Sequence, residues 1–227
     1  MRTKLNTYPQ IYHKKPTKIS FSGQRLYTLS LLKTLPDGTK EKIPAFFSEL
    51  KDIEDLQLLE NIEKLWTDNT RYAQRIISHF KNKLNPDYID FSFGYPKFFA
   101  IECPQFKNTN EKIRSLVEIR DFHFPHSYKI KWLQSASQIK SLTKLEGQGE
   151  NMIGCIVKQA QAKDDYSSIK LVSNDESIDF YEKLGFKKAI CSRYKHEYLV
   201  VKQNFLNIIN LVEKKYGEIL PVIKNEN

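Results

Sequence analysis

Two glycines lie one residue apart directly before a segment with helical periodicity. Gly147 and Gly149 flank Gln148. Glycines at the start of a helix let several backbone N–H groups point at one anion, and the helix N-terminus adds a partial positive charge. The pattern therefore predicts a loop that binds a phosphate group, and a pyrophosphate suits it best. The apolar residues with helical spacing are Met152, Ile153, Ile156, Val157 and Ala160.

A short strand and a second helix are expected after this helix. In the run 169–173, Ile169, Leu171 and Ser173 alternate with Lys170 and Val172, which is typical of a short buried strand. Ser173 and Glu176 have the spacing of a capping box, so a helix should begin near Asn174 and end at Gly185. The order of elements is thus loop, helix, strand and helix, which is the order of a ligand-binding unit.

These residues carry a resemblance to a known family. The run Lys144-x-x-Gly147-x-Gly149 resembles the acyl-CoA signature of the GNAT N-acetyltransferase superfamily, which usually has Arg or Gln in the first position. Lys144 keeps the positive charge of Arg but not its planar fork. Further matches stand in the family's order at Asn174, at Phe180-Tyr181 and at Leu184-Gly185-Phe186.

The resemblance implies an α+β (α/β) fold with a GNAT-like, mixed but mostly antiparallel central sheet flanked by helices. It implies acetyl-CoA as co-substrate and no metal. Strand 128–135 should splay from strand 169–173, and the gap should admit the pantetheine arm along the edge 133–137. The expected cofactor-binding residues are Leu133, Ser135, Lys144, Leu145, Glu146, Gly147, Gln148, Gly149, Glu150, Asn174 and Tyr181.

The activity implied is transfer of an acetyl group to an amine by direct attack in a ternary complex. Tyr181 would protonate the departing CoA thiolate, since a tyrosine with a pKa near ~10 is protonated at pH 7 and the thiol has a pKa of ~8.5. The alternative is that Tyr181 packs in the core with its hydroxyl on a backbone group. Asn174 has two explanations as well, a cofactor contact or a helix cap.

A general base is harder to identify, because strand 128–135 contains no carboxylate. Glu118 is our first candidate, and Asp121, His123 and His126 are the others. The alternative is that all four are solvated or structural side chains and that the amine arrives neutral from solution.

The rest of the chain divides into further predicted segments. Residues 1–20 form a basic N-terminal arm, 21–202 a GNAT-like acyl-CoA-binding domain and 203–227 a C-terminal helical extension that docks on the domain or forms a homodimer contact. Outside the glycine-loop unit, we expect helices over 53–66, 72–80 and 205–216. The expected strands are 26–32, 97–102, 113–122 (antiparallel to its neighbours), 128–135, 189–193 and 197–201.

Composition limits the remaining function classes. The formal net charge is +9, from 36 Lys and Arg against 27 Asp and Glu, and only part of it is needed for the phosphates of CoA. The rest favours an acidic partner or nucleic acid. No apolar run approaches a membrane span, and three scattered cysteines suit a reducing compartment, so we expect a cytoplasmic protein. Two alternatives to an enzyme with an unidentified amine acceptor stay open: a non-catalytic CoA- or partner-binding module, and an enzyme acting on a nucleic-acid-linked acceptor such as charged tRNA.

Overall fold

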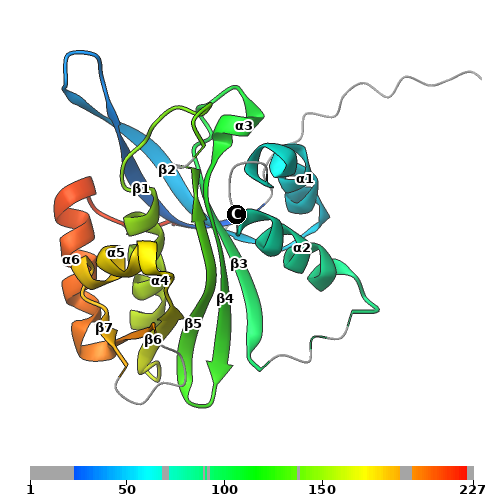
Figure 1. Cartoon of the computed structure of the whole chain (residues 1–227), viewed down its shortest axis with the longest axis vertical. Helices are drawn as coiled ribbons and strands as arrows, with labels where there is room; N and C mark the ends of the chain where they lie inside the picture. Colours follow the sequence, from blue (N-terminus) through cyan, green and yellow to red (C-terminus); the bar gives the residue numbers. More distant parts are fainter. Residues whose placement is uncertain are drawn as a thin grey trace, which may run out of the picture.

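The computed structural model describes residues 23–67, 72–88, 90, 93–136, 139–189 and 196–223, so the predicted N-terminal arm lies outside the described residues. Within them the strands form one sheet with helices on both faces (Figure 1). The elements are β1 (Gln24–Thr34), β2 (Lys40–Leu50), α1 (Ile53–Thr67), α2 (Ala73–Leu84), β3 (Tyr95–Glu102), α3 (Thr109–Lys112), β4 (Ile113–His123), β5 (His126–Ser135), α4 (Gln148–Gln161), β6 (Ser168–Val172), the 3-10 turn η2 (Asp175–Ser177), α5 (Ile178–Lys183), β7 (Lys187–Lys188), β8 (Glu197–Val201), the 3-10 turn η3 (Lys202–Asn204), α6 (Phe205–Tyr216) and β9 (Leu220–Pro221).

The sheet has the order β7-β8-β6-β5-β4-β3-β2-β1-β9. Strands β1 to β5 form an antiparallel meander, and β6 joins β5 in parallel after the α4 crossover. The predicted mixed, mostly antiparallel sheet is therefore confirmed.

Strand β2 was missed by the sequence analysis, which placed two helices directly after the first strand. Its first half reads as a charged turn that contains Pro44, a residue that interrupts a central strand. Strand β3 pairs with β2 only from Phe46 onward, so Pro44 lies on a part of β2 that has β1 as its sole neighbour. Alternate residues of the same half, Ile43 and Ala45, are buried in the core.

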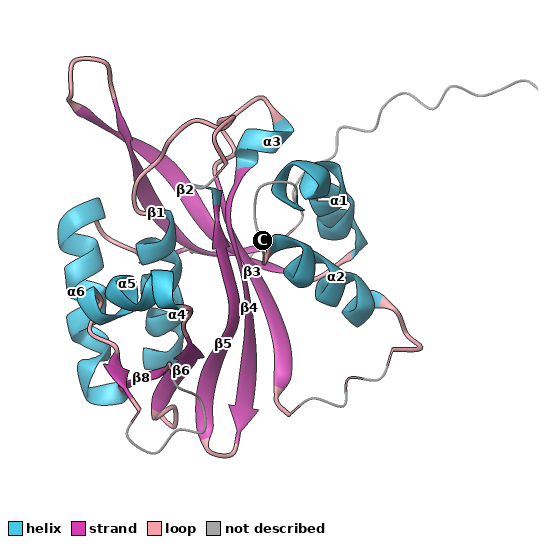
Figure 2. Cartoon of the chain, viewed as in Figure 1, coloured by secondary structure: helices cyan, strands magenta, loops and turns pink. Residues whose placement is uncertain are grey.

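The helices form two layers (Figure 2). Helices α4, α5 and α6 cover one face of the sheet, and α1 and α2 cover the other, each over its own apolar core. Helix α6 packs along α4, where a Cβ at Gly154 would lie 3.0 Å from Ile219 and 3.2 Å from Val212. The predicted C-terminal helix thus docks on the domain, and β9 beyond it pairs with β1.

The sheet opens between β5 and β6, as predicted. The two strands pair only from Ser127 to Ile130 on β5. In the pairing with β4, Glu118 lies opposite Trp132 and Ile119 opposite Ile130, so Lys131 is the extra residue of a β-bulge. A bulge bends its strand and increases the local twist. We attribute the separation of β5 from β6 to this bend.

Two local expectations need correction. Ser173 does not cap a helix, because its hydroxyl donates to the Asn174 carbonyl, and the predicted helix is instead the 3-10 turn η2 followed by the short helix α5. Strand β8 is confirmed, whereas the predicted strand 189–193 lies mostly outside the described residues. No helix within the described ranges has the length and apolar character needed to cross a membrane.

Candidate active site

The glycine loop leads into α4 as the sequence predicts. Gly147 is the N-cap residue with φ +86°, and a Cβ on it would lie 2.6 Å from the Tyr216 ring, so only glycine fits. The first helical hydrogen bond runs from Asn151 N to Gly147 O. The backbone N–H groups of Gln148, Gly149 and Glu150 therefore precede the helical ladder and bond to no described acceptor. Such N–H groups at a helix N-terminus are able to bind an anion.

These residues line a cavity of about 450 Å³, the donor cavity. It is built from the end of β5, the glycine loop, the η2–α5 segment and the C-terminal end of α6. Lys215 and Tyr216 of α6 were missed by the sequence analysis, since on α6 Tyr216 looks like one more member of an apolar stripe. The lining residues are Leu133, Gln134, Ser135, Leu145, Glu146, Gly147, Gln148, Gly149, Glu150, Ser177, Phe180, Tyr181, Lys215 and Tyr216.

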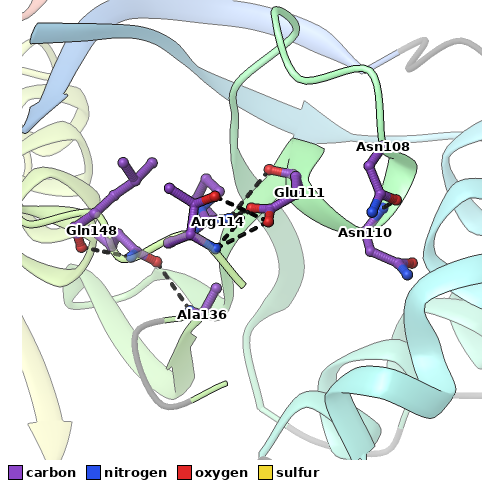
Figure 3. Close-up of polar contacts among 8 residues, drawn as sticks. Asn108, Asn110, Glu111, Arg114, Ala136 and Gln148 are labelled. Carbon is purple, nitrogen blue, oxygen red and sulfur yellow. Dashed lines mark hydrogen bonds and ion pairs between the residues drawn. The ribbon is translucent and has the colours of Figure 1, made fainter. Parts of the chain in front are cut away.

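Buried side chains fix the loop in place (Figure 3). The Gln148 amide accepts from Ala136 N at 3.1 Å and donates to Leu145 O at 2.8 Å, which ties the loop to the end of β5. Gln148 was predicted to contact the cofactor, but its side chain is used within the protein and only its backbone is open to a ligand. No local sequence pattern indicates this framework role.

A second framework contact holds the chain just before the loop. The fully buried Arg114 guanidinium donates to the Glu111 carboxylate at 2.6 Å and to the Thr143 carbonyl (Figure 3). Glu111 in turn accepts from Thr143 N at 3.0 Å. At the start of α3, Asn108 Oδ1 accepts from Asn110 N at 3.0 Å and caps the helix that carries Glu111. The Thr143 backbone, just before the glycine loop, is thereby held at its carbonyl by Arg114 and at its N–H by Glu111.

The two carboxylates of the donor cavity are neutralised by neighbours. Glu150 accepts from the Tyr216 hydroxyl at 2.7 Å and from Lys215 Nζ at 3.3 Å. Glu146 accepts from Lys40 Nζ at 2.7 Å, and this bond lowers the pKa of the Glu146 carboxyl. An anionic ligand therefore meets compensated charge in addition to the free N–H groups.

One member of the predicted binding run, Lys144, lies away from the donor cavity. Lys144 is exposed and does not line the donor cavity, whereas Leu145 lines it and is otherwise buried in the core. Of the described lysines, Lys215 of α6 lines this cavity, where it pairs with Glu150.

Tyr181 lies where the donor cavity meets the opening in the sheet. Its side chain is 8% exposed and packs edge-on against Phe180 and Phe186. Burial raises the pKa of the Tyr181 hydroxyl, with a smaller contribution from Tyr72, so the phenol holds its proton at neutral pH. Its hydroxyl hydrogen bonds to none of the described residues, which leaves the proton available to a ligand.

A narrow passage of about 60 Å³ runs from Tyr181 between β5 and β6. It shares Leu133, Ser177 and Tyr181 with the donor cavity. On its other side it opens to a cavity of about 690 Å³, the acceptor-side cavity, whose lining residues are Tyr72, Phe93, Arg120, Phe122, Lys129, Ile130, Lys131, Trp132, Val172, Ser173 and Asn174. The passage thus connects the two cavities, and Tyr181 lines the passage and the donor cavity.

Asn174 lines the passage and the acceptor-side cavity, but not the donor cavity. Its side chain forms no helix cap, and its Oδ1 atom is buried without a hydrogen-bond partner within the described part of the chain. A buried acceptor in this state is suited to a donor on a ligand. The capping explanation is therefore not supported, and a ligand contact would come from the acceptor side.

The candidate bases do not line either cavity or the passage. Glu118 is fully buried, 2.8 Å from His79 Nδ1 and 2.9 Å from Arg120. The Asp121 carboxylate lies 2.7 Å from Lys97 and also accepts from the Tyr166 hydroxyl. Burial opposes ionisation of Asp121, but these two hydrogen bonds outweigh it and lower the pKa of its carboxyl.

The two histidines lie at the β4–β5 turn. His123 is exposed, and His126 Nδ1 lies 3.1 Å from an Asp165 oxygen. Both are remote from the lining of the passage. The part of the chain that the structure describes holds no group of three or more His, Cys, Asp or Glu side chains that could bind a metal, and a metal-free reaction stays a prediction.

Comparisons with known proteins yield structural matches only. No family model and no curated protein matches the chain. The spermidine/spermine N-acetyltransferase SpeG of Vibrio cholerae, in mutant forms, is 13% identical with a TM-score of 0.47, over 72% of this chain and 96% of that chain. NAA60 of Arabidopsis thaliana, in complex with a bisubstrate analogue, is 16% identical with a TM-score of 0.45, over 69% and 96%. AtaT in the DNA-bound AtaT–AtaR complex is 14% identical with a TM-score of 0.46, over 71% and 97%.

The fold itself can be compared with the expectation from the sequence. A mostly antiparallel sheet, a glycine loop at the start of α4 and an opening between β5 and β6 beside Tyr181 are all present. The chain therefore has the GNAT-like fold that its sequence motifs implied.

Proposed function

We propose that this protein is an N-acetyltransferase that transfers the acetyl group of acetyl-CoA to an amine. One observation carries the proposal: unpaired backbone N–H groups at the start of α4 open into a cavity that ends at Tyr181.

The donor cavity fits the parts of CoA in order. The N–H groups of Gln148, Gly149 and Glu150 would bind the pyrophosphate, with Lys215 adding positive charge. Leu133 and Ser135 belong to the part of β5 that no longer pairs with β6, and they would contact the pantetheine arm as an added strand does. When bound, acetyl-CoA supplies an acetyl group activated as a thioester.

Tyr181 would act as the general acid. The acceptor nitrogen forms a bond to the acetyl carbon, the carbon–sulfur bond breaks, and the Tyr181 hydroxyl protonates the sulfur. The amine releases its proton to water, and the Tyr181 phenolate takes up a proton from water, which restores the phenol. The raised pKa of Tyr181 keeps the acid in its protonated form before each turnover.

The acceptor amine would react in its neutral form without a dedicated base. The described residues that line the passage include neither a carboxylate nor a histidine. Glu118 is committed to His79 and Arg120, so we no longer favour it as the base.

The first experiment measures binding and turnover separately. Saturating acetyl-CoA should raise the melting temperature by mass action. With an accepted amine, Tyr181→Phe should lower kcat about a hundredfold, in the range expected for loss of a general acid, with the KM for acetyl-CoA little changed. Tyr198→Phe, which removes a hydroxyl bonded to Glu182, is the matched control and should leave kcat unchanged. An unchanged melting temperature would rule out the donor site.

A second candidate function is a CoA-binding module without turnover. The absence of a base among the described residues of the passage favours it. A panel of amines distinguishes the two: a melting-temperature shift without release of free CoA from any amine would support the module over the enzyme.

A further inference from the structure

The acceptor-side cavity is built on the face of the sheet that α1 and α2 cover. Trp132 contacts the core under these helices, and Glu118, which lies opposite Trp132, bonds to His79 of α2. Because side chains alternate along a strand, Arg120 and Phe122 of β4 share the face of Glu118. A ligand in this cavity would approach the passage from the side opposite α4.

Aromatic rings make up much of the wall. The rings of Tyr72 and Trp132 stack with centroids 5.1 Å apart at 21°, and the Arg75 guanidinium lies 4.6 Å above Trp132. Phe122 lines the cavity further along β4, and Phe93 lies on its wall with 89% of its side chain exposed. Aromatic side chains on a cavity wall favour a planar group on the ligand.

The charged side chains of the wall are all positive. Among the described residues that line the cavity, Arg120, Lys129 and Lys131 carry charge and no carboxylate does. Arg120 is compensated by Glu118 and Asp90. Lys131, the bulge residue, forms no ion pair with any described residue. Lys131 therefore leaves a positive charge at this wall that attracts an anionic ligand.

Three buried polar atoms of the wall lack hydrogen-bond partners within the described part of the chain. Two are donors, the indole Nε1 of Trp132 and the Nε of Arg120, and one is an acceptor, Oδ1 of Asn174. Leaving such atoms unpaired is costly, so a ligand that satisfies them gains affinity. The two donors suit an anionic oxygen, and the acceptor suits the N–H of an amine beside the passage.

On the basis of the proposed function, we infer that the acceptor is a small amine that also carries an anionic group and a planar ring. The anion, a carboxylate or a phosphate, binds near Lys131 and the Trp132 indole N–H. The ring packs against the Tyr72–Trp132 pair, and the amine reaches Asn174 and the passage to Tyr181. Spermidine, a flexible polycation, has neither the anionic group nor the ring that these contacts would bind.

The test uses Trp132 as an internal probe of binding. The chain has two tryptophans, and Trp66 is fully buried away from this cavity, so a ligand here changes the Trp132 emission. Phenylalanine is the anionic probe, phenylalaninamide keeps the ring and the amine without the negative charge, and spermidine is the polycation. We expect phenylalanine to bind at least tenfold more tightly than either. Loss of the emission change in Trp132→Phe confirms the location.

Lysine variants test the charge directly. Lys131→Gln should weaken phenylalanine about tenfold and leave phenylalaninamide unchanged, and Lys131→Arg should restore binding. Lys33→Gln removes one positive charge from β1, far from the cavity lining, and should have no effect. Asn174→Ala should weaken both amines equally, because it removes the acceptor for the N–H and not the charge.

One further ligand distinguishes a carboxylate from a phosphate as the anionic group of the acceptor. An aminoacyl ester of adenosine monophosphate offers phosphate in place of the free carboxylate. Tighter binding of this ester than of phenylalanine assigns a nucleotide-linked acceptor, and weaker binding assigns a free carboxylate.

Equal binding of phenylalanine, its amide and spermidine overturns the inference, as does an unchanged affinity in Lys131→Gln. The proposed function fails separately. It is tested by the melting temperature with acetyl-CoA, which involves none of these acceptor-side residues.

Discussion

The two cavities that the passage beside Tyr181 connects differ in the groups that would bind a ligand. The donor cavity offers backbone N–H groups at the start of α4, held in place by buried side chains such as Gln148 and Arg114. The acceptor-side cavity offers side chains from five separate segments, among them Tyr72 before α2 and Asn174 after β6.

This difference has a chemical consequence. A site built from backbone N–H groups recognises the shape and charge of a phosphate. Its affinity depends little on side-chain identity, provided that the loop keeps its conformation. A site built from side chains discriminates between individual ligands, and one substitution can alter which ligand the site prefers. Substitutions in the donor cavity should therefore act through loop geometry, and substitutions on the acceptor side through charge and shape.

The largest effect is expected from Gly147→Ala. A non-glycine residue at φ +86° costs about 1–2 kcal/mol, and its Cβ would displace the Tyr216 ring. Acetyl-CoA affinity should fall at least a hundredfold, measured by the shift in melting temperature. The control is Gly38→Ala at φ +82°, which meets nothing within 4 Å and should cost stability without affecting acetyl-CoA. Equal loss of acetyl-CoA binding in both variants would show that binding does not depend on the geometry of the loop at Gly147.

The next effect concerns the stability of the ion pairs beneath the acceptor side. Glu118→Gln removes a buried charge from between His79 and Arg120 and should lower the free energy of unfolding by about 3 kcal/mol, measured by urea titration. Its kcat at saturating acceptor should stay within about threefold of the unchanged protein. Glu102→Gln, at a buried carboxylate paired with Arg25, is the control for stability alone. A hundredfold loss of kcat confined to Glu118→Gln would restore this residue as the base.

The pH profile separates the roles of the acid and the amine. With no base in the passage, kcat/KM for the acceptor should rise about tenfold per pH unit until the amine itself is neutral. Tyr181 must be protonated to act, and burial raises its pKa above the ordinary ~10, so its deprotonation causes no decline between pH 6 and 9. Initial rates across this range test both statements. A plateau well below the pKa of the amine would reveal a base that the described residues do not include.

The same contrast decides how much could be predicted from the sequence. The donor loop is contiguous, so the glycines, the periodicity of α4 and the Phe180-Tyr181 pair were sufficient to place it. The acceptor side depends on long-range packing, and no local pattern shows that Tyr72 and Trp132 stack or that α2 covers Glu118.

Errors in the prediction have the same origin. Alternation along β4 places Glu118 on one face, but it cannot show which helix lies over that face. Tyr216 was predicted only as the last residue of the helix 205–216, and the docking of α6 on α4 brings its hydroxyl to Glu150. Gln148 was correctly placed at the loop, yet its side chain is used by Ala136 and Leu145, contacts that depend on the end of β5.

The smallest effect tests whether α6 belongs to the donor cavity. Lys215 lies 3.3 Å from Glu150 and is largely exposed, so its contribution to phosphate binding is screened by water and salt. Lys215→Gln should weaken acetyl-CoA about threefold at low salt, with the difference vanishing near 0.5 M salt, as isothermal titration can measure. Lys214→Gln, at the neighbouring position outside the cavity lining, should have no effect. Equal weakening by both variants would mean that only the net charge of α6 matters. A loss confined to Lys215 would show that the C-terminal helix supplies the positive charge that Lys144, exposed and away from the cavity lining, does not.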